Sequence, residues 1–128
     1  MRVLLDTHVF LWWAVDDPRL SATARAVLLD KRNEVLLSAV TGWEIDIKAQ
    51  LGKLSLADPP AAFVADQIQV HGFVVLPIQM DHVLRVFDLP HHHRDPFVRL
   101  LIAQSGVEGI PLLTGDVVFG RYAVDTIW

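Results

Sequence analysis

Cysteine is absent from the 128 residues of this chain. Disulfide bonds, thiolate-bound zinc, iron–sulfur clusters and cysteine nucleophiles are therefore excluded, and any metal site must use oxygen or imidazole ligands. The sequence also lacks an apolar run near the roughly 20 residues that a membrane-spanning helix needs. It shows no basic, apolar and cleavable leader. We therefore expect a soluble, cytoplasmic protein with no membrane partner.

Basic residues are slightly fewer than acidic ones. The 11 Lys and Arg against 15 Asp and Glu give a net charge of −4 with His neutral. A sequence-independent nucleic-acid binder is usually basic, so this balance counts against that class. It does not exclude a nuclease, because a site for divalent cations must itself be acidic. Repeats and linkers are absent, and the length fits one compact domain, residues 1–128.

Short apolar runs alternate with helix-like stretches along the chain. Strands are predicted at 3–5, 34–40, 73–78 and 110–114, with a candidate fifth within 122–128. Helices are predicted at 9–14, 22–31, 42–51, 61–70, 82–88 and 97–107, and their expected N-caps include Ser21, Thr41, Asp81 and Asp95. This alternation predicts a three-layer α/β/α domain with a mostly parallel sheet of four to five strands.

Three acids fall at corresponding places in this pattern. Asp6 ends the first strand, Glu44 lies in the first turn of the helix after the second, and Asp116 follows the fourth. Ligands of such folds bind beyond the carboxyl ends of the strands, so we expect the three carboxylates to converge there. Clustered carboxylates need protons or a cation, and Mg²⁺ and Mn²⁺ prefer oxygen ligands. Such a site could hydrolyse phosphodiesters, because the metal lowers the pKa of a bound water.

Each of these acids also has a purely structural interpretation. An Asp after a strand often caps a helix, and the helix dipole favours an acid such as Glu44 in a first turn. Asp116 could be a turn residue. Ser38 and Thr114 could bond a carboxylate or a metal-bound water, or serve only as cap and turn residues. The shared position of the acids at strand ends favours the functional interpretation.

Five segments, taken together, resemble the PIN-domain ribonucleases, and more narrowly the VapC toxins of VapBC toxin–antitoxin pairs. They are LLDTHVFLWW (4–13), SAVTGWEI (38–45), LPHHHRDPF (89–97), RLLIAQ (99–104) and LLTGD (112–116). Each is short, but they occur in the family's order over nearly the whole chain. The resemblance implies a Mg²⁺- or Mn²⁺-dependent endoribonuclease that cleaves structured RNA such as tRNA or rRNA. It also implies a homodimer. A VapB-type antitoxin would inhibit this dimer in a larger complex, and the dimer would contact DNA only through the antitoxin.

By position, the resemblance assigns Asp6, Glu44 and Asp116 to the family's acidic quartet, with Asp6 and Asp116 as metal ligands. The fourth acid is missing, because Val98 stands where the family usually has Asp. A valine side chain can neither bind metal nor orient water. Asp95 lies three residues earlier, and its Asp-Pro context predicts a helix cap, with substitution as a ligand as the alternative.

Two explanations of Val98 remain open. It is an engineered change that disarms a toxin, which the intact remainder of the motif favours, or a natural loss that leaves a catalytically inactive PIN-fold interaction module. Both predict that this chain binds metal weakly and cleaves RNA poorly. A DNA-specific nuclease of related fold is a further alternative, because acids and metal read phosphate and not the 2′-hydroxyl.

The remaining candidates are weaker. The His91-His92-His93 run is predicted to be a solvated loop, because consecutive residues point in different directions. Arg94 and Arg99 could contact RNA, pair with the acids or serve only on the surface. The aromatic residues of the first and third helices are expected in the core or at an interface more often than stacked on bases. A phosphoacceptor receiver domain is disfavoured, because Asp6 is not followed by a second acid and no Lys follows Lys53.

Overall fold

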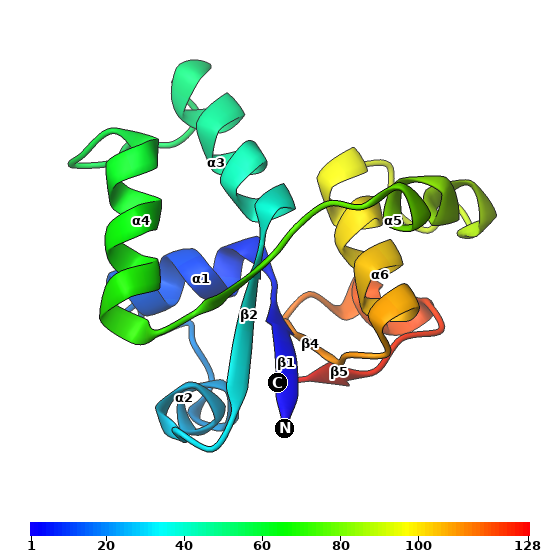
Figure 1. The fold of residues 1–128 in the computed structure, drawn as a ribbon, viewed down its shortest axis with the longest axis horizontal. Helices are drawn as coiled ribbons and strands as arrows, with labels where there is room; N and C mark the ends of the chain where they lie inside the picture. The colour runs from blue at the N-terminus through cyan, green and yellow to red at the C-terminus, as the bar shows by residue number, and fades with distance from the viewer.

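Five short parallel strands form the centre of the molecule (Figure 1). The computed structural model describes residues 1–128. Its strands are β1 (Arg2–Leu5), β2 (Glu34–Ser38), β3 (Val74–Leu76), β4 (Leu112–Leu113) and β5 (Thr126–Ile127). They pair in the order β3-β2-β1-β4-β5, and every pair is parallel. The predicted α/β sheet is confirmed, with β1 at its centre.

Six helices and two 3₁₀ turns surround this sheet. The helices are α1 (Thr7–Ala14), α2 (Ala22–Leu29), α3 (Ala39–Gln50), α4 (Pro60–His71), α5 (Met80–Arg85) and α6 (Pro96–Glu108); the 3₁₀ turns are η1 (Val86–Asp88) and η2 (Val117–Arg121). In Figure 1, α1, α2 and α4 lie on one side of the sheet, whereas α5 and α6 lie on the other. No helix combines the length and apolar character that crossing a bilayer requires.

Alternation along the strands divides the core into two clusters. Val3 and Leu5 point to the α1 side and pack with Phe10, whereas Leu4 points to the α6 side and packs with Leu101. All five side chains are almost completely buried. Because β1 is covered on both faces, it reads in the sequence as a continuous apolar run. The central strand is thereby fixed in place, together with the residue that follows it.

Helix α3 begins three residues earlier than the sequence analysis predicts. The N-cap is Ser38, whose Oγ accepts the Val40 N–H at 2.9 Å, and the helix starts at Ala39 instead of Gly42. The predicted cap, Thr41, is therefore a buried residue of the first turn. The difference has a physical reason: the apolar run that forms β2 continues into the helix without a break, so the pattern does not mark the serine cap inside it.

Helix α5 also differs from the prediction, since its N-cap is Gln79 and not Asp81. The Gln79 N–H donates to Nδ1 of the buried His82 at 3.0 Å, so the chain turns two residues before Asp81. The caps predicted for α2 and α6 are confirmed. Ser21 Oγ accepts the Ala24 N–H at 3.0 Å, and Asp95 caps α6 ahead of Pro96.

The packing of Phe10 gives a test of the core. Its ring lies edge-on to Phe63 (5.8 Å between centroids) and to Phe73 (6.0 Å), and it is fully buried. We expect Phe10→Ala to lower the free energy of unfolding by about 3–5 kcal/mol, because a cavity replaces the ring. The control Phe87→Ala removes a ring that is 90% exposed and should change it by less than about 0.5 kcal/mol. Urea denaturation measures both, and equal effects would contradict this account of the core.

Candidate functional site

Asp6 occupies the first position beyond the central strand. Its backbone N–H donates to the Leu113 carbonyl at 3.1 Å, which extends the β1–β4 ladder by one residue. Its carboxylate is buried and accepts a hydrogen bond from the Thr114 hydroxyl at 2.9 Å. No ion pair forms between Asp6 and a Lys or Arg. The sheet thus holds an acid at its carboxyl edge without a cation to neutralise it.

Burial raises the pKa of Asp6 above its usual value of 3.8. The hydrogen bond from Thr114 and the charge of His8 act in the opposite direction, whereas the charge of Glu44 adds to the increase. Desolvation is the largest of these effects, since a carboxylate loses solvation when it is removed from water. The site is therefore electrostatically unfavourable for ionised Asp6 unless a cation lies nearby.

Thr114 connects Asp6 to Asp116. The Thr114 hydroxyl donates to Asp6 and accepts the N–H of Asp116 at 3.1 Å. The Asp116 side chain is exposed, and its Oδ1 accepts the Val118 N–H at 3.0 Å as the cap of η2. Both roles that the sequence left open for Thr114 are observed, because its hydroxyl bonds a carboxylate and also accepts the N–H two residues further on, as in a turn. Asp116 acts as a turn residue here and keeps Oδ2 available.

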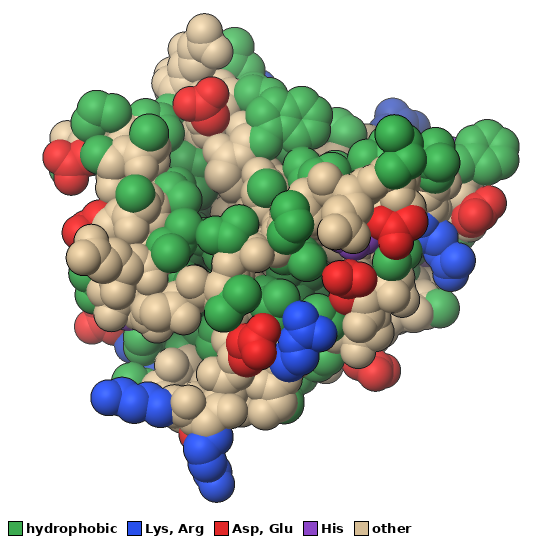
Figure 2. Space-filling model, viewed as in Figure 1, with side chains coloured by type: hydrophobic (Ala, Val, Ile, Leu, Met, Phe, Trp, Pro, Cys, Tyr) green, Lys and Arg blue, Asp and Glu red, His purple; other side chains and the backbone are tan.

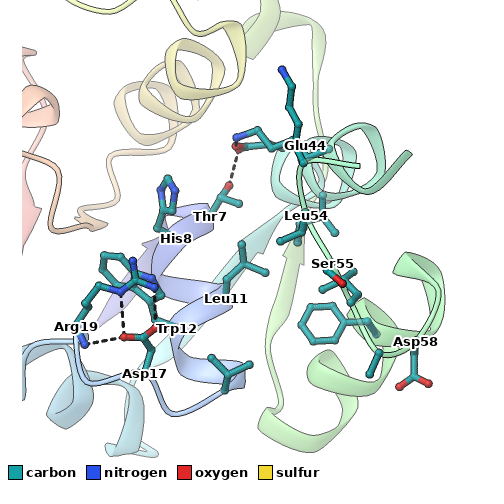
Figure 3. Close-up of a pocket in the computed structure, with 17 residues that line it drawn as sticks. Thr7, His8, Leu11, Trp12, Asp17, Arg19, Glu44, Leu54, Ser55 and Asp58 are labelled. Carbon is teal, nitrogen blue, oxygen red and sulfur yellow. Dashed lines mark hydrogen bonds and ion pairs between the residues drawn. The ribbon is translucent and has the colours of Figure 1, made fainter. Parts of the chain in front are cut away.

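Glu44 lies on α3 and is almost completely buried. The Thr7 hydroxyl donates to its Oε1 at 2.8 Å and also lies 3.0 Å from the Thr41 hydroxyl. Lys48, one turn further along α3, forms an ion pair with Oε2 (Figure 3 shows Glu44 and Thr7). Because α3 begins at Ala39, Glu44 lies in the second turn of the helix and not in the first. The helix holds it over the end of β1.

A cavity of about 480 Å³ opens beside Glu44 (Figure 3). It lies between α1 and the segment that joins α3 to α4, so both polar and apolar side chains contribute to its wall. Its lining includes Thr7, His8, Trp12, Arg19, Glu44, Lys48, Lys53 and Phe63. Asp6 and Asp116 are not part of this lining. The cavity therefore adjoins the acids without containing all of them.

The expected convergence of all three acids into one metal-binding group is not found. No three His, Asp or Glu side chains are arranged to hold a metal ion together. Lys48 already neutralises Glu44, and Asp116 is turned toward η2. The donors at Asp6 and Asp116 nevertheless fit a hydrated Mg²⁺, which is usually held by one or two carboxylates and several waters. The buried Asp6 carboxylate, without a cationic partner, is the observation that supports this fit.

Position 98 contributes no oxygen to the site. Val98 lies in the first turn of α6, half-buried, and packs against the cluster formed by residues such as Leu100 and Leu101. Asp95 caps α6, because its Oδ1 accepts the N–H groups of Phe97 (2.8 Å) and Val98 (3.4 Å). Only this oxygen is engaged, as in Asp116, so its use as a substitute ligand stays a prediction.

Ser38 and Arg99 have structural roles instead of the supporting roles considered from the sequence. Ser38 caps α3 and donates to Gln104 Oε1 at 2.5 Å, and so does not bond a carboxylate. Arg99 is buried, and its guanidinium donates to the carbonyls of Val86, Leu89 and Pro90. It therefore holds the segment before the His91-His92-His93 loop and pairs with none of the acids.

Thr7 and Lys48 are site residues that the sequence analysis missed. Thr7 follows Asp6 directly, but a threonine beside a strand end carries no distinctive signal. Lys48 could have been found, because Glu and Lys four residues apart face each other on a helix. These two residues hold the Glu44 carboxylate from two sides.

Comparisons with known proteins agree with this architecture. A family model described as the PIN domain matches residues 3–125. Ribonuclease VapC16 of Mycobacterium tuberculosis is 44% identical over 69 residues, which cover 51% of this chain and only 48%, about half, of that relative. Ribonuclease VapC22 of the same organism is 27% identical over 117 residues, covering 89% of this chain and 86% of the relative.

Solved structures with the same fold are also found. VapBC2 from Rickettsia felis, bound to a promoter DNA fragment, aligns with a TM-score of 0.74 at 13% identity and covers 99% of this chain and 98% of its own. DNA-bound VapBC from Salmonella typhimurium aligns with a TM-score of 0.71 at 16% identity, with coverages of 99% and 97%. At these identities the likeness establishes the fold.

The raised pKa of Asp6 predicts a pH-dependent stability. A carboxyl whose pKa is higher in the folded than in the unfolded chain stabilises the fold at low pH, and that contribution is lost as pH rises through the folded value. We expect Asp6→Asn, which can still accept the Thr114 hydrogen bond, to raise the melting temperature in EDTA at pH 7.5. The gain should shrink toward pH 4. Asp116→Asn, at an exposed carboxylate, is the control, and a lower melting temperature for Asp6→Asn at pH 7.5 would contradict the prediction.

The ion pair of Lys48 gives a second prediction. Lys48→Met leaves the buried Glu44 carboxylate without its cation, and we expect a loss of about 1–3 kcal/mol in the free energy of unfolding. Lys48→Arg should keep most of the stability. Lys53→Met is the matched control, because Lys53 lines the same cavity but forms no ion pair. Urea denaturation at pH 7.5 compares the three, and equal stability of the two Met variants would refute the role of the pair.

Proposed function

Because this chain belongs to the PIN-domain family, we propose that it is a VapC-type toxin, a metal-dependent endoribonuclease whose activity is impaired at Val98. The observation that carries the proposal is the buried Asp6 carboxylate at the end of β1, joined through Thr114 to Asp116. An acid of this kind, buried without a cationic partner, is unfavourable for the fold alone and suits a cation site. The names of the two curated relatives, both VapC ribonucleases, support the RNA substrate.

In the proposed mechanism, Asp6 and Asp116 hold Mg²⁺ or Mn²⁺. The ion, when bound, lowers the pKa of a water and stabilises negative charge on the phosphoryl oxygens. Thr114 keeps the Asp6 carboxylate turned toward the site. Glu44, held by Thr7 and Lys48, is the group that orients the attacking water by accepting its hydrogen bond. The proposed product is a cleaved phosphodiester of structured RNA, such as tRNA or rRNA.

Val98 explains the proposed impairment. Val98 lies in the first turn of α6, where valine offers no ligand atom, and Oδ1 of Asp95 is engaged as the cap. With one acid fewer, the site binds the metal more weakly. A catalytically inactive interaction module is the second candidate, and the pairing of Glu44 with Lys48, which removes one free carboxylate, is the observation that favours it.

The partners belong to the same proposal. The solved VapBC assemblies with this fold include complexes bound to DNA. We infer for this chain a VapB-type antitoxin, a larger complex with it, and contact with DNA only through it, in the cytoplasm. A homodimer is supported by hydrophobic side chains at the α5 end of the molecule (Figure 2). There Met80 is 72% exposed, Leu84 66% and Phe87 90%, and such exposed apolar groups mark interaction sites.

Restoring the carboxylate tests the proposal. We expect Val98→Asp to increase both Mn²⁺ affinity and the rate of RNA cleavage by at least about tenfold, a difference of roughly 1.4 kcal/mol. Isothermal titration calorimetry measures the affinity, and gel assays on total tRNA and rRNA measure the cleavage. Val98→Asn is the matched control, because asparagine has the shape of aspartate without its charge. Its Mn²⁺ affinity and cleavage rate should stay close to those of the parent chain.

The outcomes separate the candidates. Cleavage by Val98→Asp that EDTA abolishes supports the impaired ribonuclease. If Val98→Asp binds no more Mn²⁺ than Val98→Asn and cleaves no RNA, position 98 is not a ligand position and the interaction module is favoured. Cleavage of DNA but not RNA by Val98→Asp would identify the DNA-specific alternative.

A further inference from the structure

A cluster of aromatic and cationic side chains lies beside the acids and has no part in the mechanism above. The indoles of Trp12 and Trp128 have centroids 5.9 Å apart and are tilted by 54°. His8 lies 5.9 Å from Trp12 on the same helix, and the Arg19 guanidinium lies 5.0 Å from the centre of the Trp12 ring. The Arg19 guanidinium donates two hydrogen bonds to the Asp17 carboxylate, which holds Arg19 in place. The cluster is therefore an organised surface.

Both ends of this cluster reach the proposed catalytic edge. The Trp128 ring packs on Gly115, the residue before Asp116, so closely that a Cβ at Gly115 would lie 2.7 Å and 2.8 Å from two ring carbons. At the other end, His8 follows Asp6 by two residues, in the first turn of α1. Trp12 and His8 also line the cavity that Glu44 borders (Figure 3). The cluster therefore adjoins the chain next to Asp6 and Asp116 and the cavity that Glu44 borders.

The cluster is accessible to solvent, and its surroundings suit a nucleobase with its phosphate. Trp128 is 40% exposed and His8 is exposed, whereas Trp12 is half-buried and packs in part against the core. The adjoining cavity of about 480 Å³ falls within the size range of small-molecule sites. Lys53 lines it without an ion pair, so one cation is available to a phosphate. Flat rings provide contact area to any nucleobase, because every base has a π-face.

We propose that Trp12 and Trp128 form a stacking platform for one unpaired nucleobase of the RNA strand, next to the phosphodiester that a cation held by Asp6 and Asp116 would bind. This inference rests on the proposed ribonuclease function and adds to it the site that positions the substrate. Arg19 fixes the Trp12 ring through a cation–π contact, and Gly115 leaves the space in which Trp128 lies against the acid edge. The platform requires a base that is not paired, which restricts cutting to loops and single strands.

RNA binding in EDTA, where cleavage is suppressed, tests the platform. The probe is a fluorescein-labelled single-stranded RNA 12-mer of mixed sequence, compared with a 12-mer in which the bases are replaced by abasic sites. We expect Trp12→Leu and Trp128→Leu each to weaken binding of the base-bearing RNA by roughly 5- to 150-fold. Trp12→Phe should keep most of the affinity. Binding of the abasic strand should be weak and the same for all variants.

Two further variants control for folding and for loss of any exposed indole. Trp43→Leu is matched to Trp128→Leu, because Trp43 is 49% exposed but packs on Phe97 instead of the cluster; its affinity should equal that of the parent chain. Gly115→Ala keeps Trp128 but must displace its ring, and should weaken RNA binding without loss of the folded state in circular dichroism.

Several results would overturn the platform. Unchanged affinity in both Leu variants would do so, as would an equal loss for the abasic strand. Normal RNA binding combined with lost binding of a purified VapB-type antitoxin would identify a protein-docking surface in place of a base site. If Val98→Asp cleaves RNA and adding Trp12→Leu or Trp128→Leu leaves KM unchanged, the platform alone is wrong. If neither the parent chain nor Val98→Asp binds or cleaves RNA, the proposed function fails with it.

Discussion

The rest of the site depends on one electrostatic constraint, the burial of the Asp6 carboxylate at the end of the central strand. Strand β1 is covered on both faces and lies between β2 and β4, so the residue after it is fixed in a place with little solvent. A hydroxyl from the neighbouring strand is its direct hydrogen-bond partner from a side chain. A hydroxyl dipole offsets only part of the lost hydration of an anion. The fold therefore retains an acid that would be better neutralised, which is why a cation site is the interpretation that explains it.

The carboxylates at this edge differ in how their charge is neutralised or solvated. Glu44 is neutralised within its own helix by Lys48, and Asp116 is solvated and caps a short 3₁₀ turn. Asp6 has neither a cation nor open solvent. At the position where a further acid is expected, Val98 adds apolar contact to the α6 side of the core. The structure thus has apolar packing where the resemblance predicts a charge, and under the proposed function this replacement weakens metal binding while it adds to the core.

The sheet, the helix order and the placement of Asp6 beside Thr114 could be predicted from the sequence, because apolar runs and strand ends carry strong signals. The start of α3 could not, because Ser38-Ala39-Val40 continues the apolar run of β2 and the cap is visible only through its hydrogen bond to Val40. The same shift moved Glu44 by one turn. The separation of Asp116 from the other acids depends on the η2 turn, which periodicity does not reveal. The sequence does not decide between RNA contact, pairing with the acids and a surface role for Arg99, because no local pattern predicts that three backbone carbonyls will accept its hydrogen bonds.

The hydrogen bond between Asp6 and Thr114 joins residues that are 108 positions apart. Strand β4 can dock beside β1 only after almost the whole chain has been made, and contacts so distant in sequence form late and slowly. A nascent chain on the ribosome consequently carries Asp6 without the partner that orients it. Under the proposed ribonuclease function, this order of assembly postpones RNA cleavage until synthesis is nearly finished, and it leaves time for the proposed antitoxin to bind first.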